Sequence, residues 1–508
     1  MVLFTSAPLV GMFVSSLLLS TVTFARPAPF APAIFLPGAK RDVPLPSNNI
    51  GLIPSGSGNL YRTNITLGGL QLTVRLDTST SDLVVNLQGR QLDIKNTTND
   101  HAKAVYVDGE ADGVIAFADL QLGEFTISSQ AFLNVTDITG LDNFEDGILG
   151  VANDLSVIEE ALSESSLGEA AGERLGKPPM QALFSQRTDL SPNFDVQLSR
   201  FSEVGDVTPG IFLIGDHDTK FQEVLNATQL TLNQNAHGGG VWSAAMDNMN
   251  VNGQPFFFNQ TILVDQASDK VAAAFSTDSP FSMLPPPAVD AIYSTIPGAM
   301  KKTQDDLVWF IPCNATTNVS FVFAGQEFFV HPLDLSTPVI TQVPATNGTM
   351  QNATVCVNTY QASSQMPNQF AGFSLVLGDA FLRNVYISFN LASSSDAPFV
   401  QMISTTPDLS SALAEFQGQR AATLSQLPPA LDPSAVINVQ QMNTTGKPDQ
   451  APSAGSSTTT DSTFPVQATS AQDQSDGPSM PSNGAAKPVS YLSGLWSGAA
   501  LLPLMLLM

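Results

Sequence analysis

The 508-residue chain carries the same short pattern twice, and this repeat limits its fold more than any other feature. In the first copy, apolar residues lead into Asp77-Thr-Ser-Thr-Ser, and Asp146-Gly-Ile-Leu-Gly follows further along the chain. In the second copy, Ala273-Ala-Phe leads into Ser276-Thr-Asp-Ser, and Leu375-Val-Leu-Gly-Asp follows. Two such halves predict two similar lobes with a cleft between them.

The sequence between Gly51 and Val400 is mostly typical of β-structure. Helical periodicity is rare there; 287–296 is the best case and 155–162 is a weaker one. We therefore predict a large all-β fold with a few short helices. The expected strands are short alternating runs separated by Gly, Asn, Asp and Pro, at 64–67, 71–76, 123–132, 194–199, 321–330 and 385–389.

Composition excludes one class of partner. The chain has 45 acidic and only 20 basic residues, for a net charge of −25. A nucleic-acid partner is therefore not expected, because no basic surface is available to neutralise phosphates. The hydrophobic fraction of 43% is enough for a sizeable core.

The N-terminus has the features of a secreted protein. An apolar run over 9–19 and the small pattern Thr23-Phe-Ala predict a signal peptide over 1–25. A buried or membrane-embedded helix is the alternative, which the short apolar run disfavours. Lys40-Arg41 is interpreted as a processing site that ends a short propeptide over 26–41, although two solvated charges would give the same pattern.

The C-terminus predicts a membrane anchor. After an extension over 406–440, residues 441–490 are rich in Ser, Thr, Pro, Gln and Asp and predict a disordered linker. Residues 491–508 are nearly all apolar, and the small residues Asn483 and Gly484 lie a short polar spacer upstream. This order is typical of a signal for a glycolipid (GPI) anchor attached at one of these two residues. An ordinary tail-anchored segment is the alternative.

Sequons and cysteines also favour a secreted protein, which the predicted anchor would hold at the plasma membrane or cell wall. The only two cysteines, Cys313 and Cys356, most simply form one disulfide in an oxidising compartment. The four histidines show no ligand spacing, so neither a metal nor another cofactor is expected. Ten Asn-x-Ser/Thr sequons predict a glycosylated surface: Asn64, Asn96, Asn134, Asn226, Asn259, Asn314, Asn318, Asn347, Asn352 and Asn443.

The segment from Leu76 to Val85, Leu-Asp-Thr-Ser-Thr-Ser-Asp-Leu-Val-Val, is the strongest single motif. It resembles the first active-site motif of the pepsin-like aspartic peptidases, Asp-Thr-Gly-Ser-Ser-Asp-Leu-Trp-Val, with Asp77 and Thr78 retained. The chain has Ser79 where the family has Gly, and Val84 where the family has Trp. Taken alone, Asp77 would fit a turn-capping aspartate equally well. Colinear motifs elsewhere favour the active-site interpretation.

The resemblance continues in order along residues 55–400. Val105–Glu110 resembles the flap that covers the family's site, with Tyr106 at the flap tyrosine; a half-buried strand tyrosine is an equal alternative. Segments 194–200 and 210–215 resemble the crossover strands, and 378–389 resembles the last family signature. Cys313 and Cys356 match a disulfide of the family's C-terminal lobe.

The resemblance implies an all-β, bilobal pepsin-like fold with a few short helices and a central cleft. The N-terminal lobe is expected over 52–195 and the C-terminal lobe over 196–405. The implied activity is that of an aspartic endopeptidase, with a peptide or protein ligand in the cleft. A monomer is expected.

The second active-site motif lacks its carboxylate. In this family two carboxylates lie close together and share one proton, because neighbouring like charges do not both ionise readily. One takes a proton from a water, and the other donates a hydrogen bond to the scissile carbonyl. Counting back from Leu284-Pro285 places Ser276 at the second carboxylate and Thr277 at its supporting threonine. Ser276 cannot share a proton at acid pH.

Two other carboxylates are candidates for the missing role. Asp278 lies two residues after Ser276, at a position where the family has Gly. Asp265 ranks below it, because accepting Asp265 would break the spacing to Leu284. Ser79 adds bulk beside Asp77. A Ser-His-Asp site has no support, because no histidine lies near Ser276 in the sequence.

The sequence therefore predicts an impaired or inactive homologue at the cell surface that retains a peptide-binding cleft. An active acid endopeptidase that pairs Asp77 with Asp278 or Asp265 is the main alternative. A structural glycoprotein whose cleft binds nothing stays open as well.

Overall fold

The computed structural model describes residues 48–437, apart from 55–59, 107–108, 142–143, 145, 154–155, 201–208, 234–239, 259–269, 302–306, 345–348, 364–372 and 392–396. All described residues belong to one compact unit, Asp42–Met508. Several sequence predictions lie outside the described residues: the signal peptide, the propeptide with Lys40-Arg41, Asp265, the sequons at Asn259, Asn347 and Asn443, the linker, and the anchor site at Asn483 or Gly484.

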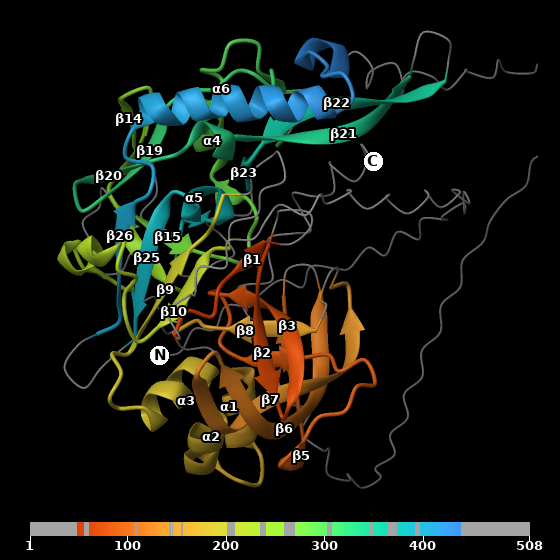
Figure 1. Ribbon diagram of the computed structural model, residues 1–508, viewed down its shortest axis with the longest axis vertical. Helices are drawn as coiled ribbons and strands as arrows, with labels where there is room; N and C mark the ends of the chain where they lie inside the picture. The colour runs from red at the N-terminus through yellow and green to blue at the C-terminus, as the bar shows by residue number, and fades with distance from the viewer. Residues whose placement is uncertain are drawn as a thin grey trace, which may run out of the picture. The chain divides into compact units, whose positions relative to one another are not determined.

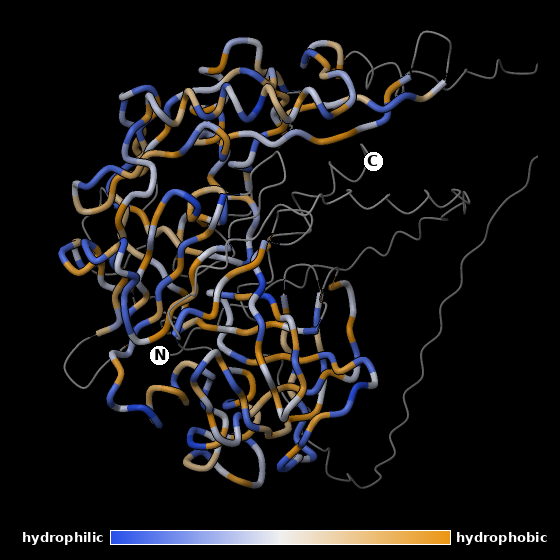
Figure 2. The backbone as a smooth tube through the Cα atoms, in the orientation of Figure 1, coloured by the Kyte–Doolittle hydropathy of each residue, from blue (hydrophilic) through white to orange (hydrophobic). Residues whose placement is uncertain are grey.

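The first half of the described chain forms one eight-stranded sheet. Its spatial order is β1-β2-β3-β8-β4-β7-β6-β5 (Figure 1). Buried and exposed positions alternate along β2, and Figure 2 shows the same alternation of hydropathy along much of the sheet. The strands are β1 Ile53–Pro54, β2 Tyr61–Leu67, β3 Leu70–Asp77, β4 Leu83–Val85, β5 Asn96–Val105, β6 Glu110–Leu122, β7 Phe125–Thr139 and β8 Gly147–Gly150.

Three helices pack beside this sheet: α1 (Val157–Glu164), α2 (Glu169–Leu175) and α3 (Pro179–Gln186) (Figure 1). Ser156 caps α1, because its side chain accepts a hydrogen bond from the Glu159 amide at 2.9 Å. The buried carboxylate of Asp82 also accepts hydrogen bonds from the Ser156 hydroxyl at 2.6 Å and from the Val157 amide at 2.8 Å. The helix start is therefore tied directly to the segment that follows Asp77.

The predicted repeat is confirmed in the strand pairing. In the first half, β3 runs parallel to β8, which lies antiparallel to β4. In the second half, β15 (Val271–Phe275) runs parallel to β24 (Leu375–Leu377), which lies antiparallel to β16 (Ser282–Leu284). The first strand of each set leads into one of the two Ser/Thr turns.

A separate five-stranded sheet has the order β10-β9-β25-β26-β11; β9, β10 and β11 lie between the two sets along the chain, and β25 and β26 follow the second set. Phe194 and Phe389 stack in its core with ring centroids 4.9 Å apart, and Trp242 packs edge-on against Phe194. The antiparallel pairing of β9 with β10 agrees with the expected crossover strands. The bounds are β9 Asn193–Gln197, β10 Ile211–Ile214, β11 Leu230–Thr231, β25 Val385–Asn390 and β26 Phe399–Ser404.

The rest of the second half forms three further sheets, with the orders β12-β15-β24-β16-β23, β14-β13-β19-β20 and β17-β18-β22-β21. The remaining strands are β12 Ser243–Met246, β13 Asn248–Val251, β14 Gln254–Phe256, β17 Met300–Lys301, β18 Trp309–Ile311, β19 Val319–Phe323, β20 Gln326–Phe329, β21 Ser336–Pro344, β22 Met350–Asn358 and β23 Tyr360–Ala362. The helical segments are η1 Gln222–Asn226, α4 Pro286–Tyr293, η2 Pro332–Asp334, α5 Asp379–Leu382 and α6 Leu409–Gln426.

The fold-class prediction is confirmed, with two local corrections. The run 321–330 was expected as one strand, but it forms the hairpin β19–β20, because Ala324 and Gly325 both adopt positive φ and turn the chain. The expected helices at 287–296 and 155–162 are present as α4 and α1 with shifted ends. The longest helix, α6 with 18 residues, was not expected.

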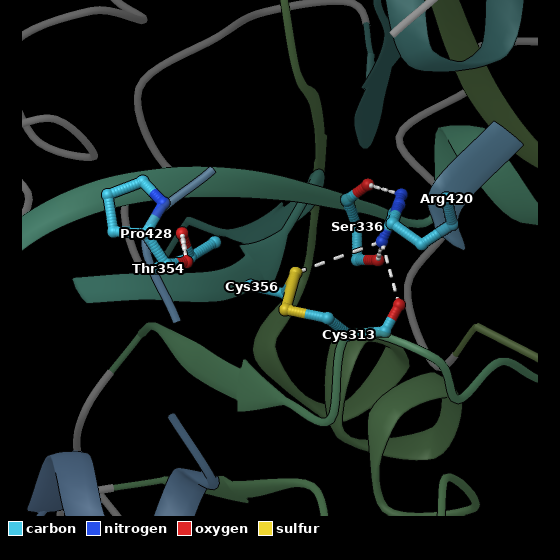
Figure 3. Close-up of a disulfide and its surroundings, with 6 residues drawn as sticks. All are labelled: Cys313, Ser336, Thr354, Cys356, Arg420 and Pro428. Carbon is cyan, nitrogen blue, oxygen red and sulfur yellow. Dashed lines mark hydrogen bonds between the residues drawn. A yellow bond between two sulfur atoms is a disulfide. The ribbon is translucent and has the colours of Figure 1, made fainter. Parts of the chain in front are cut away.

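Helix α6 lies in the C-terminal extension and packs along β21 and β22 (Figure 1). The predicted disulfide between Cys313 and Cys356 is confirmed, and it lies beneath this helix (Figure 3). Arg420, which is 1% exposed, donates hydrogen bonds to the Cys313 carbonyl at 3.1 Å and to the Ser336 carbonyl at 2.9 Å. The extension is thus built into the second half of the fold.

After α6 the chain pairs with β22 through an isolated parallel bridge between Ala430 and Thr354. The Thr354 hydroxyl donates a hydrogen bond to the Pro428 carbonyl at 2.7 Å (Figure 3), and the Leu431 amide donates one to the Thr354 carbonyl at 2.8 Å. Val436 and Ile437 then join a small hydrophobic cluster on the same sheet. No helix among the described residues is long and apolar enough to cross a membrane.

Candidate active site

Asp77 ends β3, and Ser276 follows the end of β15. Against each turn lies a glycine of the same half, Gly150 at the end of β8 and Gly378 directly after β24. A Cβ atom at Gly150 would lie 2.5 Å from the backbone of Ser81, and one at Gly378 would lie 2.2 Å from the Phe281 carbonyl oxygen. Only glycine allows so close an approach of the two backbones. The apolar-apolar-Gly pattern therefore has a steric reason in both halves.

Thr78 and Thr277 join the two turns by reciprocal hydrogen bonds. The Thr277 amide donates to the Thr78 hydroxyl at 3.0 Å, and the Thr78 amide donates to the Thr277 hydroxyl at 3.2 Å. Each hydroxyl then donates to a backbone carbonyl of the opposite strand, Thr78 to Phe275 at 3.0 Å and Thr277 to Leu76 at 2.8 Å. Both side chains are fully buried. The predicted supporting threonines thus hold the two turns together.

The Asp77 carboxyl group is fully buried between donors of its own turn. Its Oδ1 accepts a hydrogen bond from the Ser79 amide at 2.7 Å, and its Oδ2 accepts one from the Thr80 hydroxyl at 2.5 Å. Burial raises the pKa of Asp77, against the opposing effects of the Thr80 hydrogen bond and the positive charge of Arg75. The group is therefore more easily protonated than a solvent-exposed aspartate.

Ser276 contacts the turn that holds Asp77, and its partner there is another serine. The Ser276 and Ser79 hydroxyl oxygens are 2.8 Å apart, and both residues are buried. Because the Ser79 amide binds Asp77, residue 79 contacts both sides of the site. Ser79 thus does more than add bulk, since its side chain supplies a hydroxyl that engages Ser276.

Asp278 forms an ion pair with Arg75 of the other half. Asp278 Oδ1 lies 2.8 Å from Arg75 Nε, and the two side chains are 9% and 10% exposed. The Asp278 amide donates a hydrogen bond to the Ser276 hydroxyl at 3.3 Å. The carboxyl group that could have replaced the missing aspartate is therefore engaged by a guanidinium group.

Tyr106 lies in the segment that follows β5. It is 4% exposed, and its hydroxyl has no hydrogen-bond partner among the described residues. Burial raises the pKa of Tyr106 well above its ordinary value, and the negative charge of Asp77 adds to the effect. Tyr106 packs in the same hydrophobic cluster as Val84. Tyr106 therefore lies near Asp77, and its role as a flap residue stays a prediction.

Comparisons with known proteins identify this arrangement. The family model of eukaryotic aspartyl proteases matches residues 60–396. The chain belongs to the eukaryotic aspartyl protease family. It is 28% identical over 210 residues to a probable aspartic-type endopeptidase CTSD of Arthroderma otae, covering 41% of this chain and 46% of that one. It is 22% identical over 355 residues to the major aspartyl peptidase 1 of Cryptococcus neoformans var. grubii, covering 66% and 63%.

The chain thus spans about half to two thirds of the length of these relatives. The crystal structure of an aspartic proteinase from Irpex lacteus has the same fold, with a TM-score of 0.51 and 15% identity. That likeness covers 70% of this chain and 97% of the other. The chain therefore has the fold of an aspartyl protease. Whether the site can catalyse proteolysis depends on the residues that it holds.

The structure adds Arg75 to the site of this aspartyl protease homologue. Side chains two residues apart on a strand point to the same face, so Arg75 and Asp77 share one side of β3. This two-residue spacing could have shown from the sequence that Arg75 lies beside Asp77. It could not show which residue of the other half Arg75 contacts. No cluster of three or more His, Cys, Asp or Glu side chains within the described residues is suited to hold a metal ion.

Proposed function

We propose that this aspartyl protease homologue acts at the cell surface as a peptide- or protein-binding protein that does not cleave its ligand. The observation that carries the proposal is the hydrogen bond between the Ser276 and Ser79 hydroxyl groups, in place of a second carboxylate. Proteolysis by this fold needs one carboxylate to activate water while the other donates a proton. Asp77 can do only one of these tasks at a time.

The loss is large in energetic terms. A general acid or base group contributes about 10²–10⁴-fold to a rate. A serine hydroxyl does not ionise in the acid range, so Ser276 supplies neither the base nor the shared proton. Thr78 and Thr277 nonetheless join the two turns by reciprocal hydrogen bonds. A peptide site without its chemistry is the function that these contacts support.

Surface location is supported by the ends of the chain and by the sequons. The predicted signal peptide and GPI signal favour export and anchoring. Among the described sequon asparagines, Asn134 is half-buried, and the others are exposed and thus open to glycosylation: Asn64, Asn96, Asn226, Asn314, Asn318 and Asn352.

An active acid endopeptidase is the second candidate, because Asp77 is retained and burial raises its pKa. In that case Asp278 would have to leave Arg75 and approach Asp77, or Asp265 would have to take its place. The 2.8 Å contact between Asp278 and Arg75 disfavours the first route.

The test is cleavage of an unfolded protein by the purified chain between about pH 3 and 6, the range in which a carboxylate pair titrates. We expect no turnover above that of Asp77→Ala. Turnover that disappears in Asp77→Ala would overturn the proposal and establish an altered catalytic pair. Peptide binding is measured separately with the same unfolded protein.

A further inference from the structure

We propose that the Arg75–Asp278 ion pair is a latch that closes the peptide site between the two halves, and that protonation of Asp278 releases it. Peptide binding would then strengthen as the pH falls. This inference rests on the proposed function, because it concerns how the peptide site opens. Its first support is position: Arg75 belongs to β3, and Asp278 belongs to the turn after β15.

The ion pair lies beside the site itself. Arg75 shares a strand face with Asp77, and Asp278 is two residues from Ser276. Arg75 lies close enough to Asp77 for its charge to oppose the rise in the Asp77 pKa. Asp278 and Asp77 both lie close enough to Tyr106 to affect its pKa. The Arg75–Asp278 pair and Tyr106 therefore lie beside Asp77.

The site is closed in the present conformation. Asp77 is 0% exposed, and Ser79, Ser276 and Tyr106 are 7%, 8% and 4% exposed. The backbone contacts of Thr78 and Thr277 are buried still more deeply than the ion pair. Opening can therefore separate Arg75 from Asp278 while the threonine contacts stay in place.

Protonation acts on this contact through charge. A carboxylate that loses a guanidinium partner on opening binds a proton more readily in the open state, so acid favours opening. Breaking a buried pair without protonation would leave an uncompensated charge, which is strongly unfavourable. The latch is thus held at neutral pH and weakened in acid.

The neighbouring carboxyl groups do not replace Asp278 in this role. Burial raises the pKa of Asp77, and the Arg75 charge opposes that rise. On the other side, the Asp379 amide of α5 donates a hydrogen bond to the Ser279 carbonyl at 2.8 Å. Burial raises the pKa of Asp379 well above its ordinary value. Among the described residues, the titratable or charged groups around the turn include Arg75, Asp77, Asp82, Tyr106 and Asp379.

Binding is measured with the full-length chain and fluorescein-labelled, reduced and alkylated casein, by anisotropy between pH 6.5 and 3.5. We expect the dissociation constant of the parent to fall about threefold by pH 3.5, because an aspartate freed from its partner begins to bind a proton near the ordinary pKa of about 4. Asp278→Asn should bind at pH 6.5 at least as tightly as the parent does at pH 3.5. Asp189→Asn is the matched control, because it neutralises the exposed pair with Arg187 and should keep the parent's pH profile.

A second measurement needs no ligand. Amide exchange in the segments 71–79 and 276–282, corrected for intrinsic rates, should rise on acidification in the parent and be high and pH-independent in Asp278→Asn. Arg75→Gln removes the other partner and should behave in the same way. If the parent and both variants exchange alike at each pH, the latch is wrong. If exchange follows the expectation but casein binds to none of them, the latch stands and the proposed peptide binding fails.

Discussion

The turn after β3 and the turn after β15 each follow a strand that pairs in parallel with a later strand, β3 with β8 and β15 with β24. Each passes over a glycine that cannot carry a side chain, and each places a threonine where it bonds the other turn. The two turns differ in the residue that each presents at the site. The first presents Asp77 and the second presents Ser276.

This difference separates two kinds of constraint. Close packing of the backbones requires Gly150 and Gly378, and the hydrogen bonds between the two turns require Thr78 and Thr277. A change at any of the four would disturb the way in which the turns are held. Catalysis requires carboxylates, which the two joined turns do not need for folding. A chain can therefore lose the chemistry of one turn while it keeps the geometry of both. The new contacts, Ser79 with Ser276 and Arg75 with Asp278, fill the space that remains.

The largest expected effect comes from making the two turns alike. The triple variant Ser79→Gly/Ser276→Asp/Asp278→Gly restores the family pattern in the second turn and removes the hydroxyl beside Asp77. We expect casein cleavage at pH 4 to rise by about 10²–10⁴-fold over the parent, because a second acid–base group becomes available. Ser276→Asp alone should gain least, since Ser79 still contacts both sides of the site.

Asp77→Ala in the triple background is the control and should abolish the gained cleavage. Full activity from Ser276→Asp alone would show that Ser79 does not obstruct the site. No gain in the triple variant would show that the two turns differ in more than these three residues.

The next effect tests the two joined turns. Gly378→Ala would bring a Cβ to 2.2 Å from the Phe281 carbonyl oxygen, and Gly150→Ala makes a similar overlap in the first half. We expect each to lower the free energy of unfolding by about 3 kcal/mol, measured by urea denaturation. Gly418→Ala is the control, because a Cβ there meets nothing within 4 Å and alanine favours the helix α6. A much milder loss at one of the two glycines would break the equivalence of the halves.

Sequence patterns predicted the strands and the two joined turns well, for a physical reason. Strand alternation, the repeated turn and the Gly positions are local, so the fold, Asp77, the threonines and the disulfide were accessible from the chain alone. The partner of Arg75 depends on side chains from two distant segments that meet only after folding. Helix α6 was missed for a related reason: its buried positions include Arg420 and Thr423, so its inner face lacks a clean apolar stripe.

Among the described residues, the first half has no helix that corresponds to α6. Arg420→Met tests how much α6 contributes to the stability of the second half. The buried guanidinium group donates to the carbonyls of Cys313 and Ser336 beside the disulfide (Figure 3). Its loss leaves both carbonyls without that donor, and we expect a cost of about 2 kcal/mol in urea denaturation. Lys95→Met is the control, because Lys95 forms an exposed pair with Asp119. Equal costs in the two variants would mean that α6 adds little to the second half.

The smallest expected effect on stability concerns residues on and near β9 and β25, two strands that lead into neither of the two turns. His217 Nδ1 lies 2.7 Å from Asp195 Oδ2, and Tyr386 donates a hydrogen bond to the same oxygen. The hydrogen bond to Asp195 raises the pKa of His217, with burial opposing the rise. The resulting stabilisation is complete below the unfolded-state pKa and disappears as the pH rises through the higher folded-state value.

We therefore expect His217→Gln to lower the free energy of unfolding by an amount on the order of 1 kcal/mol at pH 5.5, the scale of a partly screened ion pair. At pH 8.5 the difference from the parent should shrink toward zero, because His217 is then neutral in both folded and unfolded chains. Urea titrations at the two pH values measure it. A deficit that grows with pH would contradict the raised pKa of His217 in the folded chain, because it would reverse the sign of this linkage.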